Sequence, residues 1–366
     1  MVANSAPDRE VFAKRRQRLV GQLDGQSLLV SNLVNVRYLT GFTGSNAFLL
    51  ISESVEILLT DGRYVQQVAV ESPDLETRIR SVDSTMIALI AEALNESNVT
   101  TCQVESDSMS RALWRDLGEV TSGQTELLDS SGQVEQLRAL KDDYELSLIR
   151  RSVAINEEAL QATLEKYSTS WTELEFSWQL EREIRQRGGS GFSFEPIVAA
   201  GPSSALPHYH PTDARISDHA LLLIDWGTSF QGYASDLTRV VAIGEISDQI
   251  REIHKVVSEA KQAAMDAVRD GAEIQAVDTA ARQLIADANY GDHFNHGLGH
   301  GFGLEIHESP LMSPAYDGQL KAGMVITIEP GIYLPEIGGV RLEDNILVTA
   351  DGYERLNRIP DDFLIL

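Results

Sequence analysis

Two pairs of carboxylates are spaced so that each pair could share a divalent cation. In LLLIDWGTSFQGYASDLTRVV, two apolar runs flank a polar segment that contains glycine, which predicts a β-hairpin. A turn centred between Phe230 and Gln231 would place Asp225 directly opposite Asp236, with Cβ atoms about 4.5–5.5 Å apart. Two carboxylates buried at that distance must be protonated or share a cation. Either Asp alone is more often a turn cap, so a second pair is needed to support a metal site.

The segment MVITIEPGIYLPEIGGVRLEDNILV repeats this arrangement. Glu329 ends an apolar strand, Glu343 begins the next region, and EIGG near their midpoint can reverse the chain. His300 is a fifth candidate ligand, because glycines flank it in GLGHGFGLEIHE and glycine permits close approach of the backbone to a ligand or metal. Four carboxylates and one imidazole suit two Mn²⁺-like ions better than one structural zinc.

The distribution of histidines also points to a site. Six of the eight histidines fall in two windows, ALPHYHP and GDHFNHGLGHGFGLEIHE. Clustering favours function, although any single histidine is as often a surface or core residue. We assign this second interpretation to four of them: His210, His219, His254 and His293.

The elements that position these residues divide the chain in two. Residues 28–80 predict short strands in SLLVSN, AFLLIS and VEILLTDGRYV, and helices are predicted over 84–95 and 108–117. The first 130 or so residues therefore form a mixed α/β unit. DSSGQ, residues 129–133, is the predicted linker, which gives domains of residues 1–132 and 133–366.

The second domain is predicted to alternate helices and strands. A helix over 142–167 can be capped by Asp142 or Asp143, and the T-x-x-E capping box of Thr172 and Glu175 begins a second helix that ends at the glycines of 188–189. A third helix is predicted over about 251–269. The predicted strands are HALLLIDW, SDLTRVVAI, MVITIEP and DNILVT.

The composition excludes several classes of function. The chain has 366 residues, 43% hydrophobic and 23% charged, and we expect no membrane span and no secretory signal. A net charge of −25 disfavours binding to nucleic acid or to anionic membranes, and RRQR at 15–18 is interpreted as a solvated helix face. The single cysteine, Cys102, excludes an internal disulfide and fits a buried residue in a reducing cytoplasm, our expected location.

The motifs resemble a known family. D-W-G-x7-S-D-L-T-R, HG-L-GHG-x-G-L-E-I-H-E, I-E-P-G-I-Y and G-V-R-L-E-D-N occur in the order seen in the pita-bread metallopeptidases, the group of aminopeptidase P and prolidase, over roughly residues 135–360. NVRYLTGFTGSN and LLTDGRY resemble the N-terminal domain of the proline-specific branch. The resemblance implies an α+β chain, in which a creatinase/prolidase-like α/β domain precedes a pita-bread catalytic domain like that of methionine aminopeptidases.

The resemblance also implies roles for individual residues. Asp225 would hold one metal ion, Asp236 and Glu343 would bridge two, and His300 and Glu329 would hold the second. Trp226 departs from many relatives, which have a smaller or aliphatic residue there, and could alter packing at the floor of the site. Three histidines would line the substrate site, His208, His296 and His307, and Arg341 would support either the bridging Glu343 or the substrate.

The implied activity is hydrolysis of the Xaa-Pro bond at the N-terminus of peptides. A hydroxide bridging two divalent ions would attack the carbonyl before proline, with Mn²⁺ expected first and Co²⁺, Zn²⁺ or Fe²⁺ as alternatives. Glu329 would carry the proton to the leaving nitrogen, while His208 and His307 would donate hydrogen bonds to the oxyanion and the substrate.

Three other functions compete with this interpretation. A prolidase would cleave Xaa-Pro dipeptides, but TGFTGSN and LLTDGRY look more like the short bacterial aminopeptidase P relatives. A metal-free creatinase or a catalytically inactive binding module usually lacks some of the five ligands. Relatives are commonly dimers or tetramers, so we expect a homodimer or homotetramer whose partners are proline-containing peptides and not nucleic acid or membrane.

Overall fold

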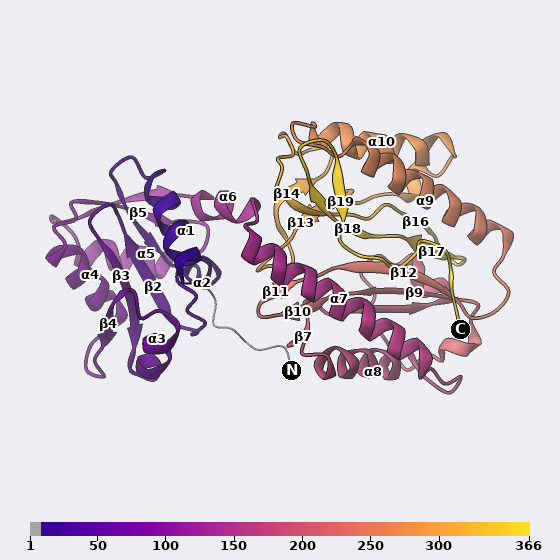
Figure 1. The fold of residues 1–366 in the computed structure, drawn as a ribbon, viewed down its shortest axis with the longest axis horizontal. Coiled ribbons are helices and arrows are strands. Elements are labelled where there is room, and N and C mark those ends of the chain that lie inside the picture. The colour runs from indigo at the N-terminus through magenta and orange to yellow at the C-terminus, as the bar shows by residue number, and fades with distance from the viewer. Residues whose placement is uncertain (1–8) are drawn as a thin grey trace. The chain divides into compact units, whose positions relative to one another are not determined.

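The chain folds into two compact units, which a computed structural model describes for residues 9–366 (Figure 1). The N-terminal unit ends at Arg138 and the C-terminal unit runs from Ala139 to Leu366. The predicted linker at 129–133 lies earlier, because Asp129 and Ser130 still belong to a strand and Val134 is buried. Residues 1–8, part of the segment in which we expected no secretory signal, lie outside the described residues.

The N-terminal unit is built around a six-stranded sheet in the order β4-β3-β2-β1-β5-β6. The β1–β2 and β2–β3 pairs are antiparallel and the other pairs are parallel. Its strands are β1 (Ser27–Val30), β2 (Ala47–Ile51), β3 (Glu56–Asp61), β4 (Glu76–Arg80), β5 (Thr101–Glu105) and β6 (Glu126–Ser130). Its helices are α1 (Glu10–Val20), α2 (Leu33–Thr40), α3 (Val65–Glu71), α4 (Met86–Glu96), α5 (Arg111–Val120) and α6 (Gln133–Ala139), the last crossing the division between the units.

Helices α2 and α3 lie where the sequence predicted only strands. Asn32, read as the end of a strand, is the N-cap of α2 and its side chain accepts a hydrogen bond from the backbone N–H of Val34. The core between the sheet and helices α4 and α5 is apolar and contains Cys102, which is fully buried as expected. Burial raises the pKa of the Cys102 thiol to about 12.

Only half of RRQR forms the solvated face that we expected, because Gln17 and Arg18 are exposed but the first two arginines are not. Arg15 and Arg16 are buried, and Arg16 donates hydrogen bonds to Glu56 at 2.8 Å and to Asp74 at 2.7 Å. The guanidinium groups of Arg15 and Arg16 therefore form hydrogen bonds inside the N-terminal unit.

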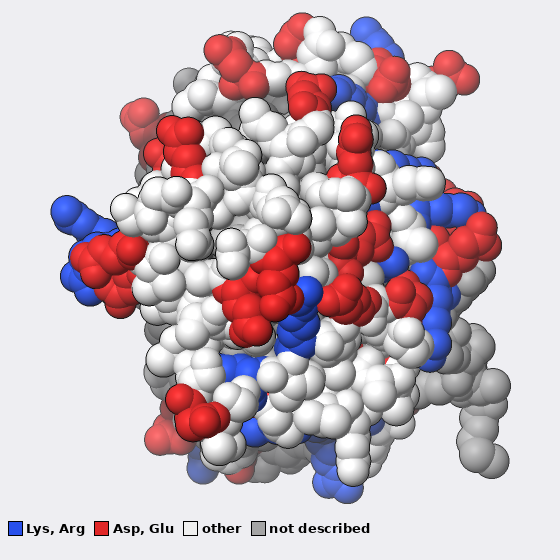
Figure 2. All heavy atoms as spheres, turned by 90° about the vertical axis from the view of Figure 1, so that its left-hand side faces the viewer, with Lys and Arg blue, Asp and Glu red and all other residues white. Residues whose placement is uncertain are grey.

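On the face of the molecule seen in Figure 2, carboxylates outnumber cations, in keeping with the acidic composition.

The C-terminal unit contains two larger sheets that carry the candidate ligands. One has the order β20-β12-β9-β8 and the other β14-β13-β15-β18-β19. Smaller sheets have the orders β11-β10-β7 and β16-β17. The strands are β7 (Gly191–Phe192), β8 (Ile197–Ala200), β9 (Leu221–Trp226), β10 (Thr228–Phe230), β11 (Tyr233–Ala234), β12 (Leu237–Ala242), β13 (Gly299–Gly301), β14 (Glu308–Met312), β15 (Val325–Ile328), β16 (Gly331–Leu334), β17 (Gly338–Arg341), β18 (Asp344–Val348), β19 (Tyr353–Arg355) and β20 (Leu364–Ile365).

Four long helices enclose these strands. Helices α7 (Asp143–Glu165) and α8 (Glu173–Gln186) lie on one side, and α9 (Asp248–Ala267) and α10 (Ile274–Asp287) on the other (Figure 1). The capping box predicted at Thr172 begins α8, and Asp142, one of the two caps considered for α7, also forms a capping box, with Glu145. Helix α10 was not predicted. Between residues 9 and 366, no helix combines the length and apolarity needed to cross a membrane.

Candidate metal centre

The first carboxylate pair lies on the β9–β12 hairpin, in a different register from the one predicted. Asp225 faces Thr238 across the ladder, so its predicted pairing with Asp236 is wrong. The turn is centred on Gln231 and Gly232, which both have positive φ, 47° and 81°. This centre lies one residue further along the chain than predicted, which shifts the partner of Asp225 by two residues. A shift of two preserves the face of a strand, so Asp236 stays on the same side as Thr238.

The second pair follows the predicted register. Strand β15 pairs Ile328 with Asp344, and the β16–β17 hairpin pairs Gly331 with Arg341 in the same antiparallel register. Continuing this register between the two ladders places Glu329 opposite Glu343. Both side chains are largely buried, with Glu343 only 1% exposed.

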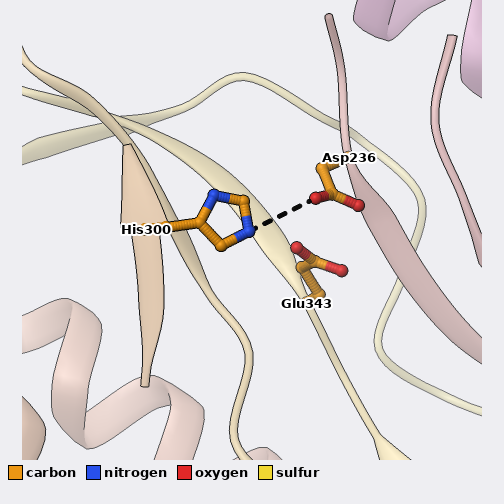
Figure 3. Close-up of side chains that lie close together, drawn as sticks. All are labelled: Asp236, His300 and Glu343. Atoms are coloured by element: carbon orange, nitrogen blue, oxygen red, sulfur yellow. Dashed lines mark ion pairs between the residues drawn. The ribbon is translucent and has the colours of Figure 1, made fainter. Parts of the chain in front are cut away.

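The glycines beside His300 allow β13 to lie unusually close to its neighbours. A Cβ atom on Gly299 would lie 2.2 Å from the carbonyl oxygen of Thr327, and one on Gly301 would lie 2.4 Å from the carbonyl oxygen of Ser309. The close approach is thus to the flanking strands, not directly to a metal. It lets β13 lie between β14 and β15, and the buried His300 side chain projects from this strand toward the carboxylates (Figure 3).

Asp236, His300 and Glu343 point toward one another (Figure 3), and their ligand atoms all lie within 4.8 Å of one another. The Nε2 atom of His300 is 3.5 Å from Asp236 Oδ2 and 3.5 Å from Glu329 Oε1. His300 Nδ1 lies 3.1 Å from the carbonyl oxygen of Gly301, which can only accept, so Nδ1 carries the proton. The lone pair of Nε2 therefore faces carboxylate oxygens, an arrangement that a cation between them would stabilise.

Arg341 connects Asp225 to the rest of the cluster. Its Nη2 atom donates to Asp225 Oδ2 at 2.6 Å, its Nη1 atom to the Tyr333 hydroxyl at 2.8 Å, and its Nε atom to Thr238 Oγ1 at 3.1 Å. The Thr238 hydroxyl in turn donates to Glu343 Oε2 at 2.7 Å. Of the two partners considered for Arg341, Glu343 is reached through Thr238.

A buried ionic network supports Glu343 from behind. Arg239 Nη1 donates to the Glu343 carbonyl oxygen at 2.6 Å, and its Nη2 atom donates to Asp344 Oδ1 at 2.7 Å. Lys261 Nζ donates to the other oxygen of Asp344 at 2.5 Å. All these side chains are fully buried, so the backbone that presents Glu343 is held on the side away from the cluster.

Burial changes the protonation of the cluster. It raises the pKa of Asp225, and it raises the pKa of Asp236 and Glu343 well above the ordinary carboxyl value, with neighbouring carboxylates adding to the effect. It also raises the pKa of Glu329 to about 8 and lowers the pKa of His300 to about 4. The cluster therefore concentrates acidic groups around a neutral imidazole.

The residues fit divalent cations. Among the described residues, Asp225 Oδ1 and Glu343 Oε1 are buried side-chain oxygens without a hydrogen-bond partner, which a bound cation would supply. Carboxylate oxygens with one imidazole form a donor set that Mn²⁺ and related ions accept.

The metal-free protein is expected to lose stability as the pH rises. A carboxyl whose pKa is raised in the folded state contributes fully below its unfolded-state pKa, and this contribution is lost as the pH rises through the folded-state pKa. For Glu329 that window runs from the ordinary value of 4.5 to about 8. Melting temperatures in a chelator should fall from about pH 5 to about pH 8. At one fixed Mn²⁺ concentration the metal should restore more stability at the higher pH, where its Kd is lower, and about 2.7 kcal/mol where that concentration is a hundred times the Kd. A Mn²⁺ effect independent of pH would contradict this.

A cavity of about 530 Å³ opens onto the cluster and collects every predicted site residue. His208 and His307 are exposed, and the His307 ring packs edge-on against His300 at 4.4 Å between centroids. His210, interpreted from sequence as a surface or core residue, also lines the cavity, whereas His293 does not. The predicted residues that line it are Asp225, Asp236, His300, Glu329, Glu343, His208, His296, His307 and Arg341.

Several site residues were missed in the sequence. Tyr333, in the I-E-P-G-I-Y motif, accepts from Arg341 and lies 2.9 Å from His296 Nε2 through its hydroxyl. Thr238 joins Arg341 to Glu343, and its position two residues after Asp236, on the same strand face, was the available signal. The other cavity-lining side chains that were not singled out include Phe194, Glu195, Ile197, Tyr209, Ile306 and Leu311.

Trp226 does not line the cavity. Its side chain is fully buried on the opposite face of β9, in the core formed with α7 and α8. Its Nε1 atom donates to the Asn156 carbonyl oxygen at 3.1 Å, and the Asn156 side chain donates to the Trp226 carbonyl oxygen at 3.0 Å. Trp226 therefore packs beneath the strand that carries Asp225.

Comparison with known proteins assigns the family. The model of metallopeptidase family M24 matches residues 147–350, which include all five candidate ligands, and the creatinase/prolidase N-terminal domain matches residues 14–140. The chain belongs to metallopeptidase family M24. As an M24 member it is a metal-dependent hydrolase, and the predicted α+β fold with a pita-bread catalytic domain after a creatinase/prolidase-type domain is confirmed.

This M24 peptidase resembles proteins of both proline-specific types. It is 34% identical to the Xaa-Pro dipeptidase of Pyrococcus furiosus over 96% of this chain and 99% of that protein. An X-Pro aminopeptidase structure from Thermotoga maritima matches with a TM-score of 0.89 and 34% identity over 96% of this chain and all of that one. A Xaa-Pro dipeptidase structure from Bacillus anthracis matches with a TM-score of 0.92 and 33% identity, over 97% of this chain and all of that one.

Proposed function

We propose that this M24 peptidase is an Xaa-Pro aminopeptidase, which removes the N-terminal residue from peptides of three or more residues whose second residue is proline. The names of the relatives support action on Xaa-Pro bonds but include both aminopeptidases and dipeptidases. The observation that favours an aminopeptidase is the charge of the cavity. A dipeptidase must hold the free carboxylate of its substrate, and a free cation is the ordinary means.

Arg341 is the one Lys or Arg among the described residues that line the cavity. Its guanidinium is fully engaged by Asp225, Tyr333 and Thr238 and is only 3% exposed. The Arg341 guanidinium is therefore already occupied within the cluster and is not a free cation for a substrate carboxylate. The space beyond the proline therefore suits continuing peptide better than a terminal carboxylate.

The proposed mechanism assigns a task to each group. Two divalent ions, first of all Mn²⁺, would be held by five residues and would lower the pKa of a water molecule and polarise the scissile carbonyl. Glu329, buried next to His300, would take the proton from the attacking water and deliver it to the proline nitrogen. His208 and His307 would donate hydrogen bonds to the oxyanion and the substrate. The five metal-holding residues would be Asp225, Asp236, His300, Glu329 and Glu343.

Substrate length is expected to separate this protein from a prolidase. With Mn²⁺ bound, kcat/KM for Ala-Pro-Ala should equal or exceed that for Ala-Pro, because the described residues that line the cavity include no free Lys or Arg to hold the dipeptide carboxylate. Ala-Ala-Ala should be turned over hardly at all. The three peptides should be compared side by side on one preparation. A preference of about tenfold or more for Ala-Pro, which corresponds to 1.4 kcal/mol, would instead identify a prolidase.

Two further points belong to this proposal. We propose that the protein acts in the cytoplasm, which its single buried cysteine supports. We also propose that it forms a homodimer or homotetramer, since relatives are commonly dimers or tetramers. An inactive binding module is disfavoured because all five candidate ligands are present and line one cavity.

A further inference from the structure

The segment 201–212, here called the His208 loop, contributes four residues to the lining of the cavity: Pro207, His208, Tyr209 and His210. It follows β8, begins with a short 3₁₀ helix (Gly201–Ala205), and presents His208 and Tyr209 to the cavity. Among the described residues, none forms a hydrogen bond with the His208 ring. The position of the His208 ring therefore depends on the backbone of the loop.

Glu173, the first residue of α8, joins both ends of the His208 loop. Its side chain is fully buried. One oxygen, Oε1, accepts from the backbone N–H of Ala200 at 2.8 Å. The other, Oε2, accepts from the Thr212 backbone N–H at 3.0 Å, the Thr212 hydroxyl at 2.8 Å and the Tyr209 hydroxyl at 2.9 Å. Hydrogen bonds to a carboxylate are shorter and stronger than those between neutral groups.

Other bonds fix the ends of the loop without the Glu173 side chain. Ala200 pairs with Leu222 on β9, and the backbone N–H of Leu174 donates to the Thr212 carbonyl oxygen at 3.1 Å. Among the described residues, the Tyr209 hydroxyl has one other polar neighbour, the Thr212 hydroxyl at 3.1 Å, and no hydrogen remains between these two oxygens while both hydroxyls donate to Glu173. Loss of the carboxylate would leave the ends attached, free Tyr209 from α8, and remove the acceptor of two backbone N–H groups. The loop would then shift between fixed ends.

We propose that Glu173 is a positioning residue for the peptidase reaction, which holds the His208 loop so that His208 and Tyr209 face the metal-binding cluster. The inference rests on the proposed function, in which His208 contacts the reacting peptide. Glu173 itself does not line the cavity and does not contact the cluster. Because it acts through His208, its loss should reduce kcat and leave metal binding intact.

A double-mutant cycle tests this on the full chain loaded with Mn²⁺, with Ala-Pro-Ala as substrate. Glu173→Ala is expected to lower kcat by about 10- to 10²-fold, the size expected for a small misplacement of a reacting group. In the His208→Ala background the same substitution should lower kcat by less than about twofold, since the group it positions is gone. Mn²⁺ content and affinity should match the wild type. Equal losses in both backgrounds, or loss of Mn²⁺, would overturn the proposal.

Glu175→Ala is the matched control. It removes the reciprocal capping bond at the same end of α8, where Glu175 Oε2 accepts from the Thr172 backbone N–H at 2.9 Å, without touching the loop. This variant should keep the wild-type kcat. A loss equal to that of Glu173→Ala would mean that helix stability alone is responsible, which also rejects the proposal.

Two measurements keep the inference separate from folding and from the proposed function. Glu173→Gln keeps the size of the side chain but turns an amide donor toward one set of loop donors, so it should lose part of kcat if Glu173→Ala does not fold. Hydrogen exchange in residues 200–213 should be faster in either Glu173 variant than in Glu175→Ala. If the wild type cleaves no Xaa-Pro peptide, the proposed function is rejected, and unchanged exchange in this segment then rejects the positioning of the loop as well.

Discussion

Replacing Glu343 by Ala is expected to reduce peptidase activity to background and to remove at least one metal ion per chain. One Glu343 oxygen accepts from Thr238, and the other is buried without a partner beside Asp236 and His300. A cation in this cluster therefore loses a ligand that no neighbour replaces. Asp236→Ala should behave in the same way. Metal content by elemental analysis and kcat on Ala-Pro-Ala measure both effects.

Controls separate loss of a ligand from unfolding. Glu343→Gln removes a carboxylate whose pKa burial raises, so this variant in chelator should be more stable than the metal-free wild type near pH 8 while still lacking activity. Glu195 lines the same cavity but is exposed and pairs with His210, so Glu195→Ala should retain full metal content. Near-normal activity with full metal content in Glu343→Ala or Asp236→Ala would refute the ligand assignment.

Replacing His208 or His307 by Ala should leave metal bound and lower kcat by about 10²–10³-fold, the loss expected for one transition-state donor or proton-transfer group. Both side chains are exposed in the cavity, and neither belongs to the cluster of Asp236, His300 and Glu343. Their expected effect is therefore on turnover. Steady-state kinetics with elemental analysis of the same preparations measure it.

His293→Ala is the control for this pair, because His293 belongs to the same histidine-rich segment as His307 but does not line the cavity. It should keep wild-type kcat. Loss of metal in His307→Ala would show that its edge-on contact with His300 is needed to hold that ligand. An unchanged kcat in both His208→Ala and His307→Ala would mean that the two histidines are ordinary surface residues without a role in turnover.

Local signals made much of the catalytic unit predictable from sequence. The helix starts at Asp142 and Thr172 were predictable because the partners in a capping box lie only three residues apart in the sequence. The opposition of Glu329 and Glu343 also followed from the sequence, because the turn lies midway between them and the register continues through both ladders.

Features that depend on turn conformation or distant partners were not predictable. The register of β9 with β12 required Gln231 to adopt a positive φ, which residues other than glycine rarely do. The burial of Arg16 depends on its partners Glu56 and Asp74, and these lie too far along the chain for a local pattern to indicate them. The contact of Glu173 with Tyr209 is equally non-local, and no periodicity in the sequence indicates it.

Alkylation of Cys102 can be used to measure how often the N-terminal unit opens. The chain has one cysteine, which lies fully buried in β5, between β1 and the edge strand β6, and its pKa is raised to about 12. Since thiol reagents attack the thiolate, alkylation of the native protein must wait until this sheet opens. All candidate metal ligands belong to the other unit. The alkylation rate of Cys102 therefore reports the opening of the N-terminal unit alone, and no probe has to be introduced.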